Sequence, residues 1–408
     1  MFARPHGLAM TTPRRALVIG GGIAGPAVAL FLARAGIEPI VFEAYPRRDE
    51  VGGGFQIAPN GMRVMAALGL ADRLLAAGTR SADMVFRNHR GRQIGLVRTH
   101  AAGSGVNLTR ATVISALRDE CERLGVAVHY ERRLVDLASV GGETVARFDD
   151  GTTESGDFAI GADGVHSRVR NWMLPDVGDA QLPRDTQMIA IGGYCDRAMK
   201  PPADLRDADR LAFVIGPRHQ LGFSRFGDGR WGWWCHVHAA TPAERTALLE
   251  MPLEQLREAM LARYAGWADP VERLIRATRE WSRVPIYDVP PLASWRKANV
   301  LLVGDAAHAM SPAGGQGASM ALEDAMVLGT LLAKPDARVD RAMTAFEQLR
   351  RPRVEPMIAQ AYENDRRTLA KLGPIARWAR DHVLMPRIAG HIGKALDGVY
   401  AYDARTVA

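Results

Sequence analysis

The sequence predicts an α/β protein that has a mostly antiparallel β-sheet domain inserted into it and a helical C-terminus. Three observations support this fold class. A strand, a glycine-rich turn, a helix and a second strand follow one another between Ala16 and Phe42. Residues 182–285 instead have the texture of short strands separated by turns, such as Gly216-Pro217. After Ala318 the sequence is nearly all helical.

The first strand–helix–strand unit carries a dinucleotide-binding signature. Gly20, Gly22 and Gly25 form the pattern Gly-x-Gly-x-x-Gly between a strand at 16–20 and a helix at 23–35. This pattern allows a tight turn and brings backbone N–H groups and the helix N-terminus close to a pyrophosphate. Glu43 follows the second strand, at 38–42, where a carboxylate would accept hydrogen bonds from a ribose. The unit predicts a Rossmann-like domain but does not separate FAD from NAD.

The elements that follow are expected in this order. Helices are predicted at 62–77 and 110–124, a hairpin at 84–97 with its turn at 89–91, and strands at 126–130, 134–137, 145–148 and 158–161. The inserted region is expected to contain strands at 188–194, 211–215, 221–226 and 231–238 and one helix near 253–264. A strand at 299–303 then leads into a Pro- and Gly-rich loop and a helix that begins near Ala318.

Composition narrows the function classes. The chain is 47% hydrophobic and 24% charged, as in ordinary globular proteins, and its formal net charge is +7. This charge fits an anionic ligand or surface, or a general preference for Arg. No basic patch is interleaved with aromatic residues, so we expect no nucleic-acid partner. Cys121, Cys195 and Cys235 have the spacing of neither a metal site nor a disulfide set. We expect no metal, no membrane span, no signal peptide and a cytoplasmic location.

Three ordered segments resemble a known family, the single-component FAD-dependent aromatic hydroxylases, or class A flavoprotein monooxygenases. These segments are the turn at 20–25, the stretch Gly-Ala-Asp-Gly-Val-His-Ser-Arg-Val-Arg at 161–170, and Gly304-Asp305 with Pro312, Gly314, Gly317 and Ala318. Lesser matches are 52–56 with Pro59-Asn60, and Arg110 at a helix start. The resemblance covers almost the whole chain. It implies a discontinuous FAD-binding domain at 10–181 and 286–365, a substrate-binding sheet at 182–285 that the hairpin 83–98 joins, and a helical segment at 366–408.

The resemblance implies FAD as cofactor, with NADPH or NADH as a transient electron donor. Asp305 would bind the ribityl chain, Arg110 would reach the ribityl-phosphate region, and Asp163 would hold its loop by hydrogen bonds. Arg47 and Arg48 would touch the adenine end or be surface charges. The residues expected to bind FAD are Gly20, Gly22, Ile23, Ala24, Gly25, Glu43, Gly54, Gln56, Arg110, Asp163, Asp305, Pro312, Gly315, Gly317 and Ala318.

The implied reaction inserts one atom of O2 into an aromatic, polycyclic or polyketide-like small molecule through a flavin C4a-hydroperoxide. The flavin carries this chemistry, so the protein needs neither a nucleophile nor a metal. The pocket candidates are Phe223, Arg225, Trp233, His236 and Pro312. Residues alternate between the faces of a strand, so the flavin meets either Leu221, Phe223, Arg225, Trp231, Trp233 and Cys235 or the opposite face with Trp234, His236 and His238. His219 is a further candidate for steering the substrate.

Other interpretations of the sequence stay open. A reductase or a halogenase of the same fold would use the same motifs, although Trp231-Gly-Trp-Trp-Cys-His-Val lacks the Ile-Pro of known halogenases. A non-catalytic flavin-binding protein is a third reading. The segment 366–392 alternates between basic and apolar residues, which favours a helical cap beside the substrate opening over a helix on a membrane surface. The sequence fits a monomer or a homodimer.

Overall fold

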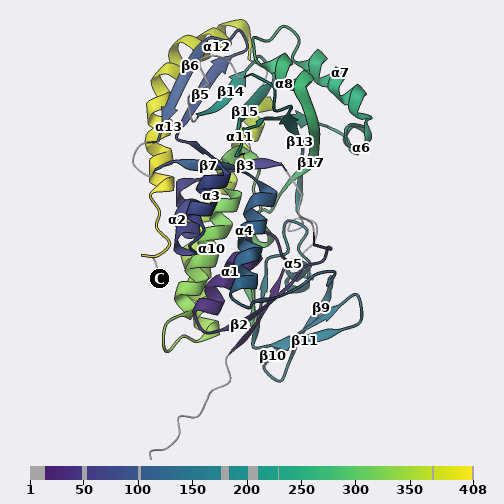
Figure 1. Cartoon of the computed structure of the whole chain (residues 1–408), viewed down its shortest axis with the longest axis vertical. Coiled ribbons are helices and arrows are strands. Elements are labelled where there is room, and N and C mark those ends of the chain that lie inside the picture. The colour runs from purple at the N-terminus through teal and green to yellow at the C-terminus, as the bar shows by residue number, and fades with distance from the viewer. Residues whose placement is uncertain are drawn as a thin grey trace, which may run out of the picture.

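A six-stranded sheet forms the lower half of the molecule in Figure 1. The computed structural model describes residues 14–47, 53–99, 103–175, 183–200, 210–227, 229–369 and 372–406. The strand order is β18-β19-β12-β1-β2-β8, and all neighbours are parallel except β18 with β19. The bounds are β1 Arg15–Ile19, β2 Glu38–Phe42, β8 Ala127–His129, β12 Phe158–Gly161, β18 Arg296–Lys297 and β19 Val300–Leu302.

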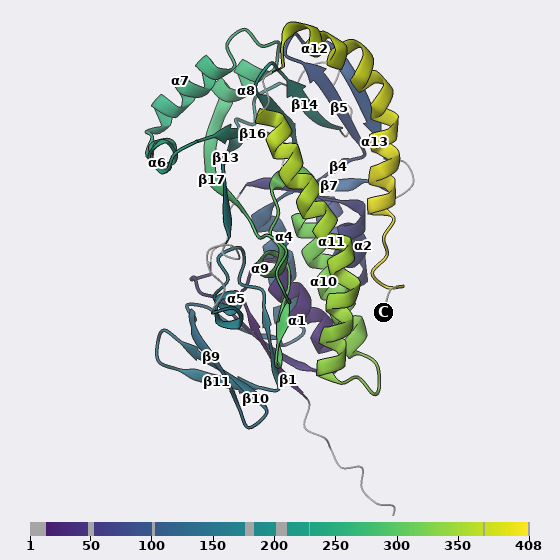
Figure 2. The same ribbon diagram turned by 180° about the vertical axis from the view of Figure 1, so that it is seen from behind.

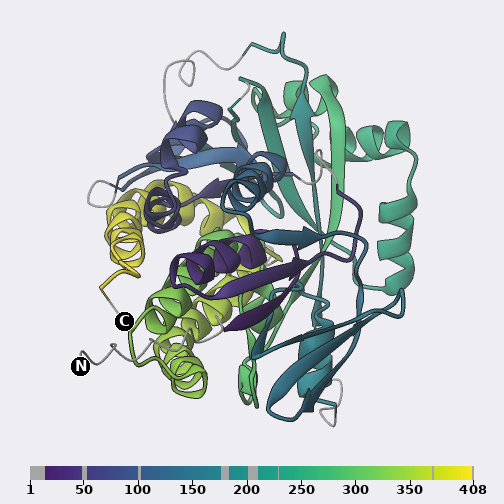
Figure 3. The same cartoon turned by 60° about the horizontal axis from the view of Figure 1, so that its bottom comes forward.

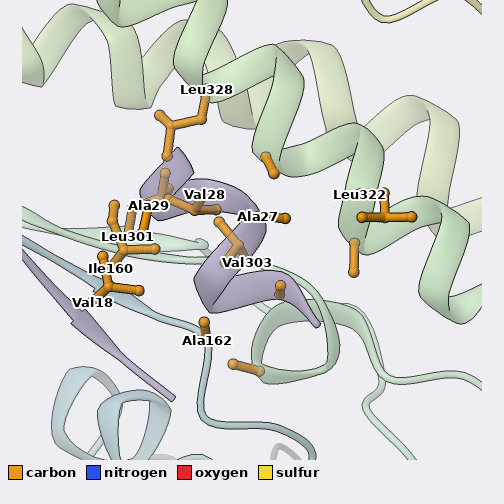
Figure 4. Close-up of a cluster of buried hydrophobic side chains, with 14 of the residues drawn as sticks. Val18, Ala27, Val28, Ala29, Ile160, Ala162, Leu301, Val303, Leu322 and Leu328 are labelled. Atoms are coloured by element: carbon orange, nitrogen blue, oxygen red, sulfur yellow. The ribbon is translucent and has the colours of Figure 1, made fainter. Parts of the chain in front are cut away.

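Helices α1 (Ala24–Arg34) and α10 (Gly317–Leu332) pack in layers on this sheet. Figures 3 and 4 show α1 between the strands and α10. A Cβ on Gly329 would lie 2.4 Å from Cβ of Phe31, so only glycine lets α10 approach α1 this closely. The fully buried Val18, Ile160 and Leu301 face α1 (Figure 4). Strands that are covered on both faces are apolar along their whole length. A meander of β9 (Leu134–Val140), β10 (Glu143–Phe148) and β11 (Thr153–Gly156) lies on the other side.

A seven-stranded sheet forms the upper half, in the order β17-β13-β16-β15-β14-β5-β6. The hairpin of β5 and β6 pairs with β14 through β5, so a segment from the first hundred residues completes this sheet. Helices α6, α7 and α8 lie beside the sheet. The bounds are β5 Asp83–Asn88, β6 Gln93–Arg98, β13 Arg184–Cys195, β14 Arg210–Ile215, β15 Gln220–Arg225, β16 Trp231–His238, β17 Thr278–Asp288, α6 Pro242–Glu250, α7 Leu253–Arg263 and α8 Val271–Ala277.

A small sheet and the C-terminal helices connect the two halves (Figures 1 and 2). The small sheet has the order β3-β7-β4. Its strands are β3 Gly54–Ile57, β4 Thr79–Ser81 and β7 Gly105–Thr109. The remaining helices and helical turns are α2 Pro59–Ala67, α3 Ala71–Ala77, α4 Arg110–Arg123, α5 Arg168–Met173, α9 Asp305–His308, the 3-10 turn η3 Pro312–Gly314, α11 Val339–Leu369, α12 Pro374–Ala379, the π-helical turn η4 Arg380–Leu384 and α13 Met385–Tyr400. Figure 2 shows α11 extending from the lower half into the upper half, while α13 packs on β6.

The structure corrects several predicted elements. The single helix expected at 62–77 is two helices, because Gly69 adopts a φ of 80° between them. The one helix expected in the inserted region is three, and α6 begins with a capping box of Thr241 and Glu244 that the sequence already contained. Strand β17 was missed because charged residues interrupt its apolar pattern. Within the described ranges, no helix is long and apolar enough to cross a bilayer.

Candidate active site

One cavity of about 1980 Å³ extends from the glycine-rich turn to the seven-stranded sheet. Its lining includes Gly20 and Glu43 at one end, Asp305 in the middle and Trp234 at the other end. The two segments that predicted opposite ends of one cofactor site therefore open onto the same space. They are also adjacent, since a Cβ on Gly304 would lie 3.1 Å from Cβ of Ala24.

The glycine-rich turn is built as the motif requires. Gly20 has a φ of 116°, donates its N–H to Phe42 O at 2.8 Å, and has no room for a side chain beside Ala162 O, 2.3 Å from its Cβ position. A Cβ on Gly25 would lie 1.8 Å from Gly20 O, so glycine lets α1 begin directly on the turn. The backbone at Ile23 and Ala24 then borders the cavity.

Gly22 has a different environment from its two neighbours in the motif. A Cβ there would meet only the Arg110 guanidinium, at 3.9 Å, and otherwise open cavity. Arg110 is the first residue of α4, whose N-terminus is capped by the Thr109 side chain. A bare backbone turn that faces a guanidinium across open space fits a diphosphate, because both supply hydrogen-bond donors to it. The residues present therefore fit the pyrophosphate of FAD.

Glu43 stabilises the turn from the end of β2. Its Oε2 accepts from Gly21 N at 2.7 Å and its Oε1 from Tyr45 N at 2.9 Å. The side chain is thus fixed where the cavity begins. Arg47 instead pairs with Glu122 at 2.9 Å on the surface, and Arg48 lies outside the described residues. Basic side chains that sequence reasoning missed line this end of the cavity, namely Arg118, Arg132, Arg133 and Arg168.

Asp163 holds its own loop. Its carboxylate accepts from Ser167 Oγ at 2.5 Å, from Arg168 N at 2.7 Å and from Val169 N at 3.1 Å. These bonds satisfy free N–H groups at the start of α5 and keep the loop against the turn, where Cα of Asp163 lies 2.9 Å from the Cβ position of Gly20. Asp163 lines the cavity beside the turn.

The loop after β19 forms the middle of the cavity. The exposed Asp305 follows Gly304, whose φ is 56°, and a Cβ on Gly317 would lie 4.0 Å from Asp305 Oδ1. Pro312 begins η3, Gly315 has a φ of 62° with nothing within 4 Å of its Cβ position, and α10 begins at Gly317. An open glycine backbone and a helix N-terminus beside a carboxylate suit a flavin ring and its polyol chain. Ala318 lines the same surface, as do Gly54 and Gln56 of β3 from the opposite wall.

A buried ionic network beneath this loop was missed by sequence reasoning. Asp324 accepts from Gly304 N at 2.8 Å, from His308 Nε2 at 2.6 Å and from Arg350 Nε at 2.7 Å. Arg350 also donates to Glu323 at 2.7 Å. Burial raises the pKa of Asp324, but the charges of His308 and Arg350 outweigh burial and leave that pKa below its ordinary value. Two adjacent acids in the apolar helix α10 were the available signal.

Aromatic side chains cover the cavity face of the seven-stranded sheet. The rings of Phe86 and Phe213 stack with centroids 5.2 Å apart, and Phe213 meets Trp234 edge to face at 5.9 Å. A Cβ on Gly222 would lie 2.4 Å from the Trp234 ring, so glycine lets the indole lie flat across β15. We call Phe86, Phe213 and Trp234 the aromatic wall; all three line the cavity.

The other face of this sheet is core, and it takes up the side chains of the pocket candidates Phe223 and Trp233, although Trp233 still contributes to the cavity lining. The rings of Phe223 and Trp233 pack in a cluster with α7 and α8, and Trp233 Nε1 donates to Thr278 Oγ1 at 2.7 Å. Arg225, on the same strand as Phe223, does not line the cavity. The sequence could not choose between the faces because α8 and β17 had not been found. Pro312 does line the cavity.

His236 is the candidate from this sheet that reaches the cavity as a polar group. It lies two residues after Trp234, on the same face of β16, and its Nδ1 is 3.5 Å from Asp365 Oδ1 on α11. Both side chains are over nine-tenths buried, and neither His236 Nδ1 nor Asp365 Oδ2 has a hydrogen-bond partner. His219 contacts Arg263 at 3.0 Å, and burial together with that charge lowers the pKa of His219 to about 4.

The chain is similar to known proteins. Residues 14–361 match a family model described as FAD binding domain. The chain is 32% identical over 356 residues to 3-amino-4-hydroxybenzoate 2-monooxygenase PtnB3 of Streptomyces platensis, covering 86% of this chain and 87% of that protein. It is 32% identical over 357 residues to salicylate hydroxylase of Pseudomonas putida, covering 82% of each.

The fold is also similar to that of a solved structure that contains FAD. Klebsiella pneumoniae HpxO complexed with FAD and uric acid superposes with a TM-score of 0.81 at 25% identity, covering 95% of this chain and 97% of that one. The α/β fold and the FAD cofactor expected from the sequence are thereby confirmed. The chain belongs to the FAD-binding-domain family of FAD-dependent aromatic monooxygenases.

Proposed function

We propose that the enzyme hydroxylates a bulky aromatic substrate that carries an ionisable hydroxyl group. The observation that supports this most directly is the aromatic wall, which continues into the polar pair His236–Asp365 on one side of a large cavity. Bound FAD would supply the redox and oxygen-transfer chemistry, with NAD(P)H as the electron donor. The protein residues then have three tasks, which are to hold the cofactor, to enclose the substrate and to position its hydroxyl.

The proposed cofactor site uses backbone more than side chains. The turn at Gly22 and the Arg110 guanidinium would bind the diphosphate, and Glu43 would accept hydrogen bonds from the adenosine ribose beside them. Asp305 would accept from the ribityl hydroxyls. The backbone from Gly315 to Ala318 would lie against the ring, where the N-terminus of α10 favours negative charge.

The proposed substrate site lies between the aromatic wall and three apolar elements. Met310 borders it from the loop after β19, Met357 and Ala361 from α11, and Leu384 and Met385 from the C-terminal helices. Such an enclosure keeps water away from a reactive intermediate and offers ring faces for stacking. The neighbouring rings of Phe86, Phe213 and Trp234 would offer several stacking faces to a substrate with fused or linked rings.

His236, which lines the cavity, and Asp365 behind it would supply a buried acid–base pair. With Nδ1 turned toward the carboxylate, the other ring nitrogen, Nε2, points away from Asp365 and can accept a hydrogen bond from a substrate hydroxyl. Asp365 would hold the imidazole in the tautomer that leaves Nε2 as acceptor, and would stabilise the imidazolium after proton transfer. Removal of that proton makes the ring more electron-rich, as electrophilic hydroxylation requires.

The test uses the FAD-loaded enzyme with salicylate, 1-hydroxy-2-naphthoate and the O-methyl ether of each. NAD(P)H oxidation, O2 uptake and incorporation of isotopic oxygen into product are measured together. The two-ring phenol should accelerate NAD(P)H oxidation most and yield a product with one labelled oxygen atom, whereas its ether should not. Acceleration by neither phenol would refute the proposed substrate class. NAD(P)H oxidation without O2 uptake, with the electrons appearing in a reduced substrate, would instead favour a reductase, and chlorinated product in the presence of chloride would favour a halogenase.

A further inference from the structure

The corner formed by α12 and η4 exposes large apolar side chains to solvent. Ile375 is 84% exposed, Trp378 59% and Leu384 51%, and Val383 is exposed beside them. Ile375 and Trp378 are three residues apart and share one face of α12, and His382 stacks on the Trp378 ring with centroids 5.0 Å apart. We call Ile375, Trp378, Val383 and Leu384 the apical patch. Adjacent exposed side chains of this size mark a contact surface more often than a free surface.

The apical patch adjoins the substrate end of the cavity. Leu372, Ala376, Ala379 and Arg380 of the same segment line the cavity, and Leu384 belongs both to the lining and to the patch. The segment is held in place from below, because Asn88 Nδ2 donates to Asp381 Oδ2 at 3.0 Å and Arg380 NH1 donates to Gly216 O at 3.0 Å. One side of this corner therefore closes the cavity, and the other side presents apolar groups outward. Figure 1 places α12 at the extreme upper end of the molecule.

The surroundings of the apical patch are basic. Between Leu372 and Leu396 the sequence has four Lys or Arg residues and a single acid, Asp381, which is buried and paired with Arg380 at 2.7 Å. Arg387 and Lys394 are exposed on α13, and Arg90 and Arg92 are exposed on the β5–β6 turn that Asn88 ties to this corner. An exposed tryptophan and aliphatic side chains with a rim of cations are typical of a surface that lies on an anionic bilayer.

From this combination we propose that the α12–η4 corner docks the enzyme onto anionic lipid bilayers. A symmetric contact between two copies would bring two basic rims together, which is unfavourable, whereas lipid phosphates complement the rim. Docking here brings the substrate end of the cavity to the lipid surface. An aromatic substrate that partitions into lipid would then reach the cavity without crossing water; this consequence alone rests on the proposed function.

The experiment measures binding of the FAD-loaded full chain to vesicles by sedimentation. The protein should sediment with vesicles of equimolar phosphatidylglycerol and phosphatidylcholine and should bind vesicles of pure phosphatidylcholine far more weakly. High salt should release it from the anionic vesicles. The double variant Ile375→Glu/Trp378→Glu should lose at least tenfold in partitioning. Arg387→Gln should lose about fivefold, the effect of one basic residue near such a surface.

The chain offers a matched control. Val135→Glu/Val140→Glu adds the same charge at exposed apolar positions of β9, at the opposite end of the molecule, and should bind as the wild type does. Failure of the wild type to sediment with anionic vesicles would overturn the proposal, as would an equal loss in this control. A lipid-free dimer that Ile375→Glu/Trp378→Glu dissociates would show that the apical patch joins two copies instead. Protein and flavin are measured separately in the pellet, so loss of FAD is not mistaken for loss of docking.

Discussion

The substitution Gly22→Val tests the cofactor site without disturbing the fold that supports it. A Cβ at Gly22 meets only the Arg110 guanidinium, 3.9 Å away, so the folded chain has room for the new side chain. We therefore expect Gly22→Val to change the free energy of unfolding of the FAD-free protein by less than about 0.5 kcal/mol. The isopropyl group would however occupy the space proposed for the diphosphate, so FAD could no longer approach the backbone.

The expected loss of affinity follows from the hydrogen bonds that disappear. Two bonds from the turn to a charged phosphate contribute about 1.5–3 kcal/mol each, or about 3–6 kcal/mol together. Their loss raises the Kd for FAD by about 10²–10⁴-fold. Gly25→Val gives the opposite pattern, since its Cβ would lie 1.8 Å from Gly20 O and the turn must break. It should destabilise the protein by about 3 kcal/mol or more.

The assay combines titration of the FAD-free protein with FAD, followed by flavin fluorescence, and thermal unfolding of the same samples. Gly390→Val is the control, because Gly390 has room for a side chain, with nothing within 4 Å of its Cβ position, and does not line the cavity. It should bind FAD like the wild type. A folded Gly22→Val protein with wild-type affinity for FAD would refute the placement of the diphosphate at this turn.

Three further predictions concern the substrate side and the buried network. His236→Asn should lower kcat/KM for a hydroxylated aromatic by about 10²–10⁴-fold with unchanged FAD content; an unaltered kcat/KM would exclude His236 as proton acceptor. Trp234→Ala should raise KM for two-ring substrates and leave the fold intact, whereas Phe223→Ala should cost about 3–5 kcal/mol of stability without changing KM, as kinetics and urea unfolding will show. Asp324→Asn should destabilise the protein by about 3–5 kcal/mol at neutral pH, because Arg350 loses a buried partner. Since the folded pKa of Asp324 is lowered, its contribution is complete above the unfolded value of about 3.9 and disappears as pH falls through the folded pKa, so acid unfolding should be shallower in the variant.

The parts of the fold that were predictable are those that local chemistry dictates. The turn at Gly20–Gly25 follows from a positive φ and from close backbone contacts that only glycine tolerates, and both leave a readable pattern in the sequence. The strand–helix–strand unit and β16 were found for the same reason, since periodicity and turn residues act over a few positions. The small strands β3, β4 and β7 escaped, because their pairing partners lie far away in the chain and their own composition is weakly patterned.

For the candidate site, the sequence by itself determined the chemistry, and the tertiary structure decided the geometry. The glycines and the acid after the second strand indicated a dinucleotide site from their local order, and the resemblance to a known family indicated FAD and a role for Arg110. Strand β16 presents two faces that alternation cannot distinguish. Helices α7 and α8 cover one face and bury the Trp233 ring in the core, whereas the Trp234 ring packs against Phe213 in the aromatic wall. His236 meets Asp365, and Gly304 meets Asp324, only when α10 and α11 fold back over strands distant in sequence. Such pairs leave no periodic signal, because what holds them together is burial and charge in the assembled molecule rather than the conformation of neighbouring residues.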